Sequence, residues 1–121
     1  MTENHLSRLL DIHASCLRIQ PLILNRSRVE FIKDKAAVRE VARELKAIRK
    51  AAKGISYSSR ESCPEIHWER LSAVQIVFFH EYYGIDVDAI WVIFQKTISA
   101  LAEELETVLK IQTLKSIIQN G

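Results

Sequence analysis

Residues 38–55 read VREVARELKAIRKAAKGI, and the spacing of their apolar side chains decides the fold class. Steps of three and four residues separate Val38, Val41, Leu45, Ile48, Ala52 and Ile55. This spacing places the six side chains on one face of an α-helix, as in the seam of a helical bundle. Gly54 stands where a helix commonly ends. The stretch therefore predicts a core helix that ends at about residue 53.

The same periodicity recurs towards both ends of the chain. Near the N-terminus the stripe consists of Leu6, Leu9, Leu10, His13, Cys16 and Leu17, and Pro21 follows it. In the last third it consists of Ile90, Ile93, Phe94, Thr97, Ile98, Leu101, Leu105 and Val108. These stripes favour amphipathic helices over residues 3–20 and 87–118.

The middle of the chain connects these helices. Residues 55–61, ISYSSRE, predict a polar loop. The following Ser62-Cys-Pro-Glu65 has the pattern of a capping box with proline in the first turn, and so predicts a third helix that ends near Gly84. Asp86 is a suitable N-cap for the last helix. Because no alternating apolar run argues for a sheet, we predict an all-α antiparallel bundle of four to five helices, two of them long, near 24–53 and 87–118.

Length and composition narrow the class of protein. With 121 residues, 48% apolar and 26% charged, the chain fits one globular domain over residues 1–121. No apolar run approaches the roughly 20 residues of a membrane span, and the N-terminus does not resemble a secretory signal. Cys16 and Cys63 have no metal-binding spacing. His5, His13 and His67 have no ligand spacing either. We therefore expect a cytoplasmic protein with two reduced thiols and without metal or cofactor.

Charge is distributed unevenly along the chain. Residues 18–53 contain eleven Lys and Arg against four Asp and Glu, whereas residues 86–106 contain five acids and one Lys. One flank of the molecule is therefore expected to attract a polyanion and the other to repel it. A solvated helix face with no ligand is the alternative interpretation of such a charge run.

The stretch that carries chemistry is residues 68–91, WERLSAVQIVFFHEYYGIDVDAIW. His80 has an ordinary pKa near 6.5, so its imidazole can act as base or acid at cellular pH. Tyr82 and Tyr83 offer phenolic donors and faces on which bases stack. The alternative is structural: a partly buried His80 that caps the end of its helix, with the tyrosines packed on the core.

The run HEYYGIDVDAIW, residues 80–91, resembles the segment around the active-site motif of HepT proteins of the HEPN superfamily. Upstream, IHW at residues 66–68 resembles the family's Pro-Trp helix start, with His67 in place of proline. Weaker similarity extends the resemblance to about residues 30–110. The family motif is Arg, four residues, His, one residue, Tyr, and it falls on His80 and Tyr82.

Two departures from the family pattern concern the chemistry. The motif arginine falls on Gln75, and the asparagine that usually follows it falls on Ile76. A Gly-Glu-Ala that commonly closes the second helix reads RKA at residues 49–51. Gln75 can donate a hydrogen bond but carries no charge. On a straight helix His80 lies about 140° from Gln75, so the site needs either a distorted helix or completion across a dimer.

The resemblance implies a metal-independent ribonuclease toxin that acts as a homodimer. Its catalytic residues would be His80, Gln75 and Tyr82, and its RNA contacts Arg43, Arg70 and Tyr83. It also implies a partner, a minimal nucleotidyltransferase (MNT) antitoxin that silences the toxin by attaching AMP to Tyr82. The alternatives are a weakened HEPN module that binds a nucleotide or the nucleotidyltransferase without cleaving RNA, and a generic helical interaction domain.

Overall fold

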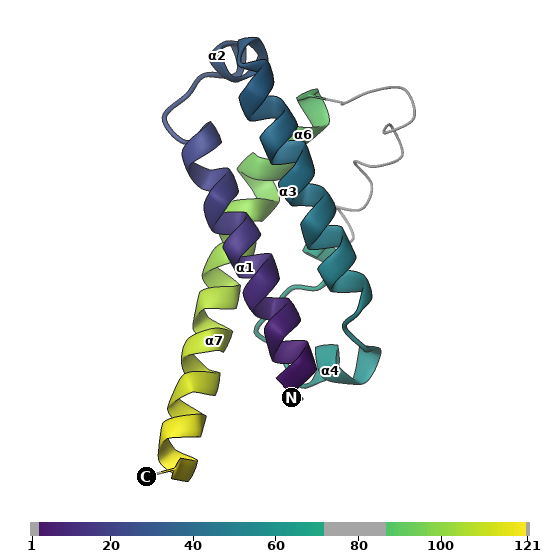
Figure 1. Cartoon of the computed structure of the whole chain (residues 1–121), viewed down its shortest axis with the longest axis vertical. Coiled ribbons are helices and arrows are strands. Elements are labelled where there is room, and N and C mark those ends of the chain that lie inside the picture. The colour runs from purple at the N-terminus through teal and green to yellow at the C-terminus, as the bar shows by residue number, and fades with distance from the viewer. Residues whose placement is uncertain (1–2, 72–86, 121) are drawn as a thin grey trace.

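The computed structural model describes residues 3–71 and 87–120, and every regular element in these ranges is helical (Figure 1). The elements are α1 (Glu3–Ile23), α2 (Arg28–Lys33), α3 (Lys35–Lys53), α4 (Tyr57–Glu61), α6 (Val87–Ile93), the π-helical η2 (Phe94–Ile98) and α7 (Ser99–Asn120). α1 packs against α3 and α7 and runs antiparallel to both (Figure 1). The predicted all-α bundle is therefore confirmed. No helix in the described ranges is long and apolar enough to cross a bilayer.

The seam of α3 is buried as predicted. Leu45, Ile48 and Ala52 are at most 1% exposed, and they pack into one hydrophobic cluster with α1 and the C-terminal helices. Burying each large aliphatic side chain stabilises the fold by roughly 1.5–3 kcal/mol. At the end of α3, Gly54 is the C-cap in right-handed geometry. A Cβ there would meet the guanidinium of Arg8 on α1, the end of a flexible side chain, which would have to move.

The buried face of α1 is rotated by part of a helical turn from the predicted stripe. Leu10 and Leu17 are half exposed, whereas Ile12, Ile19 and Ile23 are buried. Apolar residues occur on adjacent faces of this segment, so spacing alone does not identify the centre of the buried face.

The predicted end of the first helix is three residues too early, because Pro21 lies inside α1. The helix continues past the proline, with the Leu24 amide bonded to the Gln20 carbonyl at 2.8 Å. Asn25, with φ of 64°, then provides the left-handed residue that often follows a helix end.

The predicted long helix over 24–53 is two helices. Ser27 begins α2 with a capping box to Glu30, and α2 ends before Asp34. Asp34 caps α3 by accepting a hydrogen bond from the Ala37 amide at 3.1 Å. The ion pair of Arg26 with Asp34, 2.8 Å long, lowers the pKa of this carboxyl and keeps the cap ionised. Two N-terminal caps seven residues apart therefore divide the segment.

The connection after α3 also differs from the prediction. Residues 57–61, expected as loop, form α4, which Ser56 caps through the Ser59 amide at 3.2 Å. The expected helix start at Ser62–Glu65 is wrong, because the described helical geometry begins only at residue 69. The Ser62 hydroxyl instead donates to the Ser59 carbonyl at 2.7 Å, so it closes α4 and does not cap the next turn.

The C-terminal segment confirms its predicted stripe. All eight predicted residues between Ile90 and Val108 are at least 91% buried. The π-helical turn of η2 inserts extra backbone into the helix and so changes the phase between α6 and α7. Beyond Val108, α7 extends past the other helices (Figure 1), and Leu114, Ile117 and Ile118 are exposed.

Candidate functional site

Four residues of the predicted site, Gln75, His80, Tyr82 and Tyr83, lie outside the described residues. The same holds for Gly84 and Asp86. The structure describes the segments on either side of this stretch. Leu71 and Ile90 are both at least 98% buried in the same core cluster, and α6 lies against α3. Both flanks of the motif are therefore anchored in the bundle.

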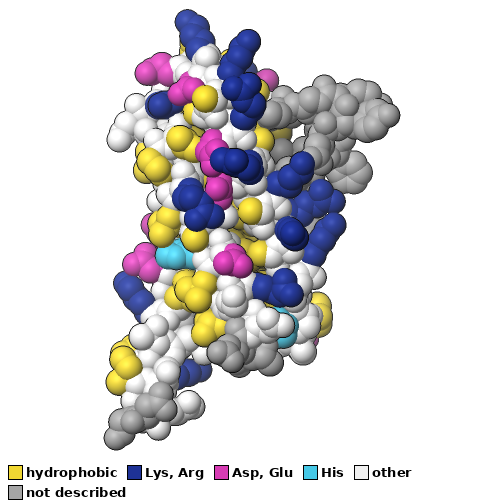
Figure 2. All heavy atoms as spheres, in the orientation of Figure 1, with side chains coloured by type: hydrophobic (Ala, Val, Ile, Leu, Met, Phe, Trp, Pro, Cys, Tyr) yellow, Lys and Arg dark blue, Asp and Glu magenta, His cyan; other side chains and the backbone are white. Residues whose placement is uncertain are grey.

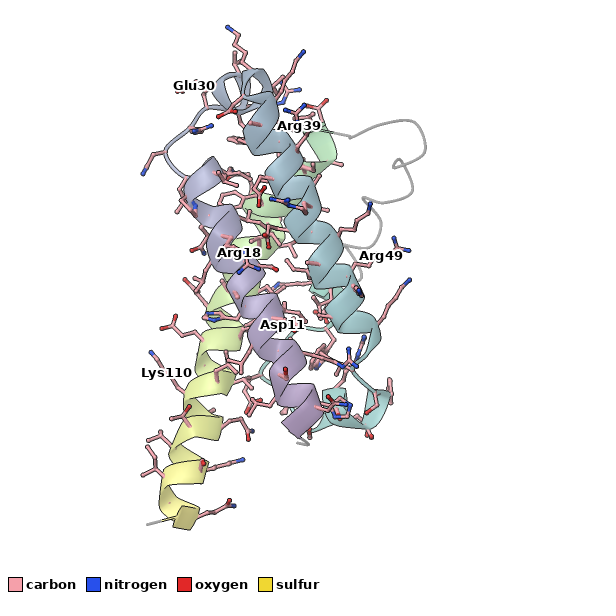
Figure 3. The ribbon with its side chains drawn as sticks, viewed as in Figure 1. Asp11, Arg18, Glu30, Arg39, Arg49 and Lys110 are labelled. Carbon is pink, nitrogen blue, oxygen red and sulfur yellow. The ribbon has the colours of Figure 1, made fainter. Side chains whose placement is uncertain are left out.

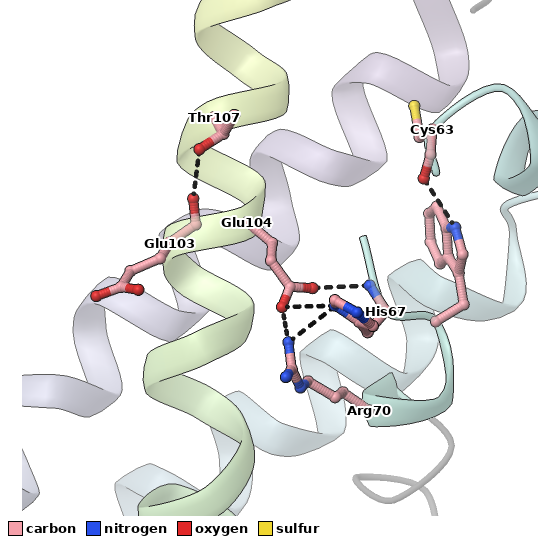
Figure 4. Close-up of polar contacts among 7 residues, drawn as sticks. Cys63, His67, Arg70, Glu103, Glu104 and Thr107 are labelled. Atoms are coloured by element: carbon pink, nitrogen blue, oxygen red, sulfur yellow. Dashed lines mark hydrogen bonds and ion pairs between the residues drawn. The ribbon is translucent and has the colours of Figure 1, made fainter. Parts of the chain in front are cut away.

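Glu104 on α7 binds the segment that leads into the motif (Figure 4). Its Oε1 accepts a hydrogen bond from the His67 amide at 2.7 Å, and its Oε2 lies 3.2 Å from Nδ1 of the His67 ring. The Arg70 guanidinium forms an ion pair with the same Oε2. The carboxylate is only 14% exposed and Arg70 29%, so water screens this pair less than a surface pair. One acid thus holds residues 67–70 against α7.

This contact changes the expectation for Arg70. The residue was predicted as an RNA contact, and the structure gives its charge an acidic partner. His67, which has no ligand spacing in the sequence, belongs to the same cluster. Trp68, between them, donates its indole N–H to the carbonyls of Arg60 at 3.0 Å and Cys63 at 3.2 Å. The segment before the motif is therefore fixed by polar bonds on both sides.

The acidic flank of the sequence is largely neutralised in the fold. Asp88 pairs with Arg28, Glu104 with Arg70, and Glu106 with Lys110. Within the described residues, these pairings offset most of the negative charge that was predicted to repel a polyanion. Charge repulsion from this side is therefore a weaker effect than the sequence count predicts.

The basic flank keeps its charge on one side of α3. Arg43, the other described RNA-contact candidate, is 74% exposed and pairs with Glu40 on the same helix. Figure 2 shows Lys and Arg side chains gathered along the α3 side of the molecule. In Figure 3, Arg49 points away from α1, whereas Arg18 lies over the seam between α1 and α3. A polyanion would therefore meet a positive surface on α3.

Glu44, on the other side of α3, is a buried acid that sequence reasoning did not single out. Its Oε1 accepts from Nε of Arg18 at 2.9 Å, and Arg18 also donates to Ser15 at 3.2 Å. Burial raises the pKa of this carboxyl, but the hydrogen bonds from Arg18 and Ser15 outweigh burial and the pKa lies below its usual value. The contact of Glu44 with Arg18 joins α3 to α1 and so fixes which way the basic side of α3 faces.

Other titratable groups in the described residues serve the fold. His5 Nδ1 lies 2.6 Å from Ser59 Oγ and links α1 to α4. Cys16 and Cys63 are free and buried, and burial raises the pKa of the Cys16 thiol to about 12. Within residues 3–71 and 87–120, no group of three or more His, Cys, Asp or Glu side chains could hold a metal ion.

Comparison with known proteins gives consistent matches. A family model described as ribonuclease HepT-like matches residues 12–108, which include the predicted motif. A protein of Thermococcus cleftensis named "Probable ribonuclease HepT" is 27% identical over 110 residues, 91% of this chain and 100% of that protein. A "Putative RNase" of Methanocaldococcus jannaschii is 32% identical over 81 residues, 67% of each chain. Another "Putative RNase", from Caldanaerobacter subterraneus, is 27% identical over 81 residues, 67% of this chain and 72% of that protein. No solved structure matches significantly.

Proposed function

The chain belongs to the HepT-like ribonuclease family, and we propose that it is a metal-independent ribonuclease whose site centres on His80. The observation that carries the proposal is the family match over residues 12–108, which spans positions 75–82 and agrees with relatives named as ribonucleases. The His-x-Tyr part of the motif stands at His80 and Tyr82.

The proposed reaction uses the RNA's own 2′-hydroxyl as nucleophile. His80 removes its proton, the 2′-oxygen attacks the adjacent phosphorus, and the bond to the 5′-oxygen of the next nucleotide breaks. The departing oxygen takes up a proton. Gln75 donates a hydrogen bond to the phosphate, where its charge develops, and Tyr82 and Tyr83 hold the flanking bases by stacking.

Gln75 in place of the motif arginine is expected to slow this reaction. Losing one preorganised donor to a developing anion typically costs about 10²–10³ in rate, and glutamine retains the donor but not the charge. Gln75→Arg is therefore expected to increase cleavage. The same departure favours the second candidate function, a HEPN module that binds a nucleotide or a nucleotidyltransferase without cleaving RNA.

Homodimerisation is part of the proposal, because a second copy would complete the site. Leu10 and Leu17 on α1, and Leu24 directly after its end, are each about half exposed and lie seven residues apart. A row of exposed leucines at this spacing is typical of helices that pair with another helix. Light scattering of a Leu10→Gln/Leu17→Gln variant is expected to show monomers, whereas Val29→Gln, an exposed residue on α2, remains a dimer. A double variant with the wild-type mass would contradict this interface.

Regulation by an MNT antitoxin completes the proposed toxin–antitoxin function. The antitoxin would transfer AMP from ATP to the Tyr82 hydroxyl and release pyrophosphate. A bulky anion there would block the site and repel RNA. With labelled ATP and the nucleotidyltransferase, wild-type protein is expected to take up label and Tyr82→Phe is not. Equal labelling of both proteins would overturn the assignment.

The nuclease proposal is tested with purified protein, RNA and EDTA. Wild-type protein is expected to cleave, and His80→Ala is expected to be inactive. His13→Gln, which changes a histidine on α1, serves as the matched control and retains activity. If wild-type protein binds RNA without cleaving it, the non-cleaving module is the correct alternative.

A further inference from the structure

All the cations of α3 lie on one side of this helix. At 100° per residue they fall within an arc of about 120°. They are Lys35, Arg39, Arg43, Lys46, Arg49, Lys50 and Lys53. The two acids of the helix, Glu40 and Glu44, lie outside this arc, between it and the buried seam. These seven cations therefore form a continuous basic ridge along α3.

The ridge is open to solvent. Six of its seven side chains belong to exposed residues, and Arg49 is partly exposed. From Lys35 to Lys53 the ridge is about 27 Å long at 1.5 Å per residue. The hydrogen-bonded ion pair of Glu44 with Arg18 joins α3 to α1, and the ridge faces away from α1 (Figures 2 and 3). Neighbouring cations of the ridge are at most four residues apart, about one helical turn.

The chemistry of the ridge distinguishes between kinds of RNA. Proteins that bind single strands place aromatic side chains where bases stack, and α3 contains no aromatic residue. A row of cations alone suits a phosphate backbone, and double-stranded RNA is recognised mainly by its shape, its phosphates and its 2′-hydroxyls. The ridge can therefore read the backbone of a paired stem but offers no surface for unpaired bases.

We propose that the basic ridge of α3 binds the phosphate backbone of a base-paired RNA stem. This inference rests on the proposed ribonuclease function for its choice of RNA as the polyanion. It assigns substrate selection to a surface outside the predicted catalytic motif.

The test measures binding without cleavage. The probe is a labelled 2′-O-methyl RNA hairpin, whose blocked 2′-oxygens cannot attack the phosphate, beside an unpaired 2′-O-methyl strand of equal length. Lys50→Gln/Lys53→Gln removes two ridge charges. Lys110→Gln/Lys115→Gln on α7 removes the same charge from exposed residues away from α3, and Lys110 is seen there in Figure 3.

The ridge variant is expected to bind the hairpin about 30-fold more weakly at 0.15 M salt. Its slope of log K against log salt should be smaller by about two, because each lost phosphate contact removes about 0.9. The control pair is expected to bind as wild type does, and the unpaired strand at least about tenfold more weakly than the hairpin.

Equal losses in the two variants would overturn the ridge as the binding surface, and equal affinity for hairpin and unpaired strand would overturn the choice of a stem. The two proposals can fail separately. If the protein binds the hairpin through the ridge but cleaves no RNA, the nuclease proposal is wrong and the ridge proposal stands. If cleavage depends on His80 but Lys50→Gln/Lys53→Gln binds the hairpin as wild type does, only the ridge proposal is wrong.

Discussion

Replacing Glu104 by glutamine tests how the segment before the motif is held. The substitution keeps the size of the side chain and one carbonyl oxygen for the His67 amide, which lies 2.7 Å from Oε1. It removes the charge that faces Arg70 and the His67 ring. Because the carboxylate is only 14% exposed, water cannot fully replace it as the partner of the Arg70 guanidinium.

The expected loss of stability lies between two limits. An exposed ion pair contributes about 0–1 kcal/mol, and a hydrogen bond to a charged group contributes about 1.5–3 kcal/mol. With Arg70 29% exposed, we expect Glu104→Gln to lower the free energy of unfolding by about 1.5–2 kcal/mol. Glu103→Gln is the matched control, because Glu103 contacts Thr107 through its backbone carbonyl, which accepts from the Thr107 hydroxyl at 3.1 Å and is kept in the variant. Its effect should stay within about 0.5 kcal/mol.

The assay is urea unfolding of both variants, of Arg70→Met and of the Glu104→Gln/Arg70→Met double variant. The double-mutant cycle is expected to give a coupling energy of about 1 kcal/mol or more between the two side chains. Equal stability of Glu103→Gln and Glu104→Gln, or a coupling energy near zero, would refute the reasoning. It would mean that the cluster in Figure 4 does not anchor residues 67–70 to α7.

Three further outcomes follow from the described residues. Since the pKa of Glu44 lies below its usual 4.5, the stability it contributes is present above about pH 4.5 and is lost as pH falls through the folded-state pKa. Urea midpoints of Glu44→Gln should therefore fall less steeply than those of wild type between pH 5 and 3, and parallel curves would contradict this. With its pKa raised to about 12, the Cys16 thiol should react with a disulfide reagent at pH 8 only when the protein unfolds, and rapid reaction in native protein would exclude the buried position. Ile48→Ala, at a fully buried position, should cost about 2–5 kcal/mol of unfolding free energy, and Ile118→Ala, 76% exposed, almost none; equal effects in calorimetry would show that α3 does not form the core.

Helices whose apolar residues form one narrow stripe could be predicted from sequence. On α3 and in the segment from Ile90 to Val108, cations and acids occupy the faces away from the seam, so spacing identifies the buried side. On α1 it does not, because Leu10 and Leu17 compete with Ile12 and Ile19 for the core. The packing partners decide the outcome, and Arg18, next to Leu17 in the chain, pairs with Glu44 on α3.

The breaks between helices depend on which of several local caps forms. Ser27 and Glu30 have the spacing of a capping box, and Asp34 is a good N-cap, so the signals for two helices over 28–53 were present in the sequence. Ser62 carried the same kind of signal and proved misleading, because its hydroxyl bonds back to the Ser59 carbonyl. A cap sequence offers a hydrogen-bond donor or acceptor, and the fold decides which partner receives it.

The candidate site rests on resemblance to a family. His80 and Tyr82 lie outside the described residues, so their roles stay predictions. The contacts of Glu44 and Glu104 could not be inferred from spacing, because their partners lie 26 to 37 residues away in the chain. The charge asymmetry of the sequence is confirmed for the exposed cations of α3, whereas the acidic flank is paired within the fold.

The chemistry of the cleaved ends tests the proposed nuclease most directly. Incubated with RNA in EDTA, the wild-type protein should leave 2′,3′-cyclic phosphate and 5′-hydroxyl ends, and His80→Ala should leave the RNA intact. Products with 3′-hydroxyl and 5′-phosphate ends, or undiminished cleavage by His80→Ala, would contradict attack by the 2′-hydroxyl at a site centred on this imidazole.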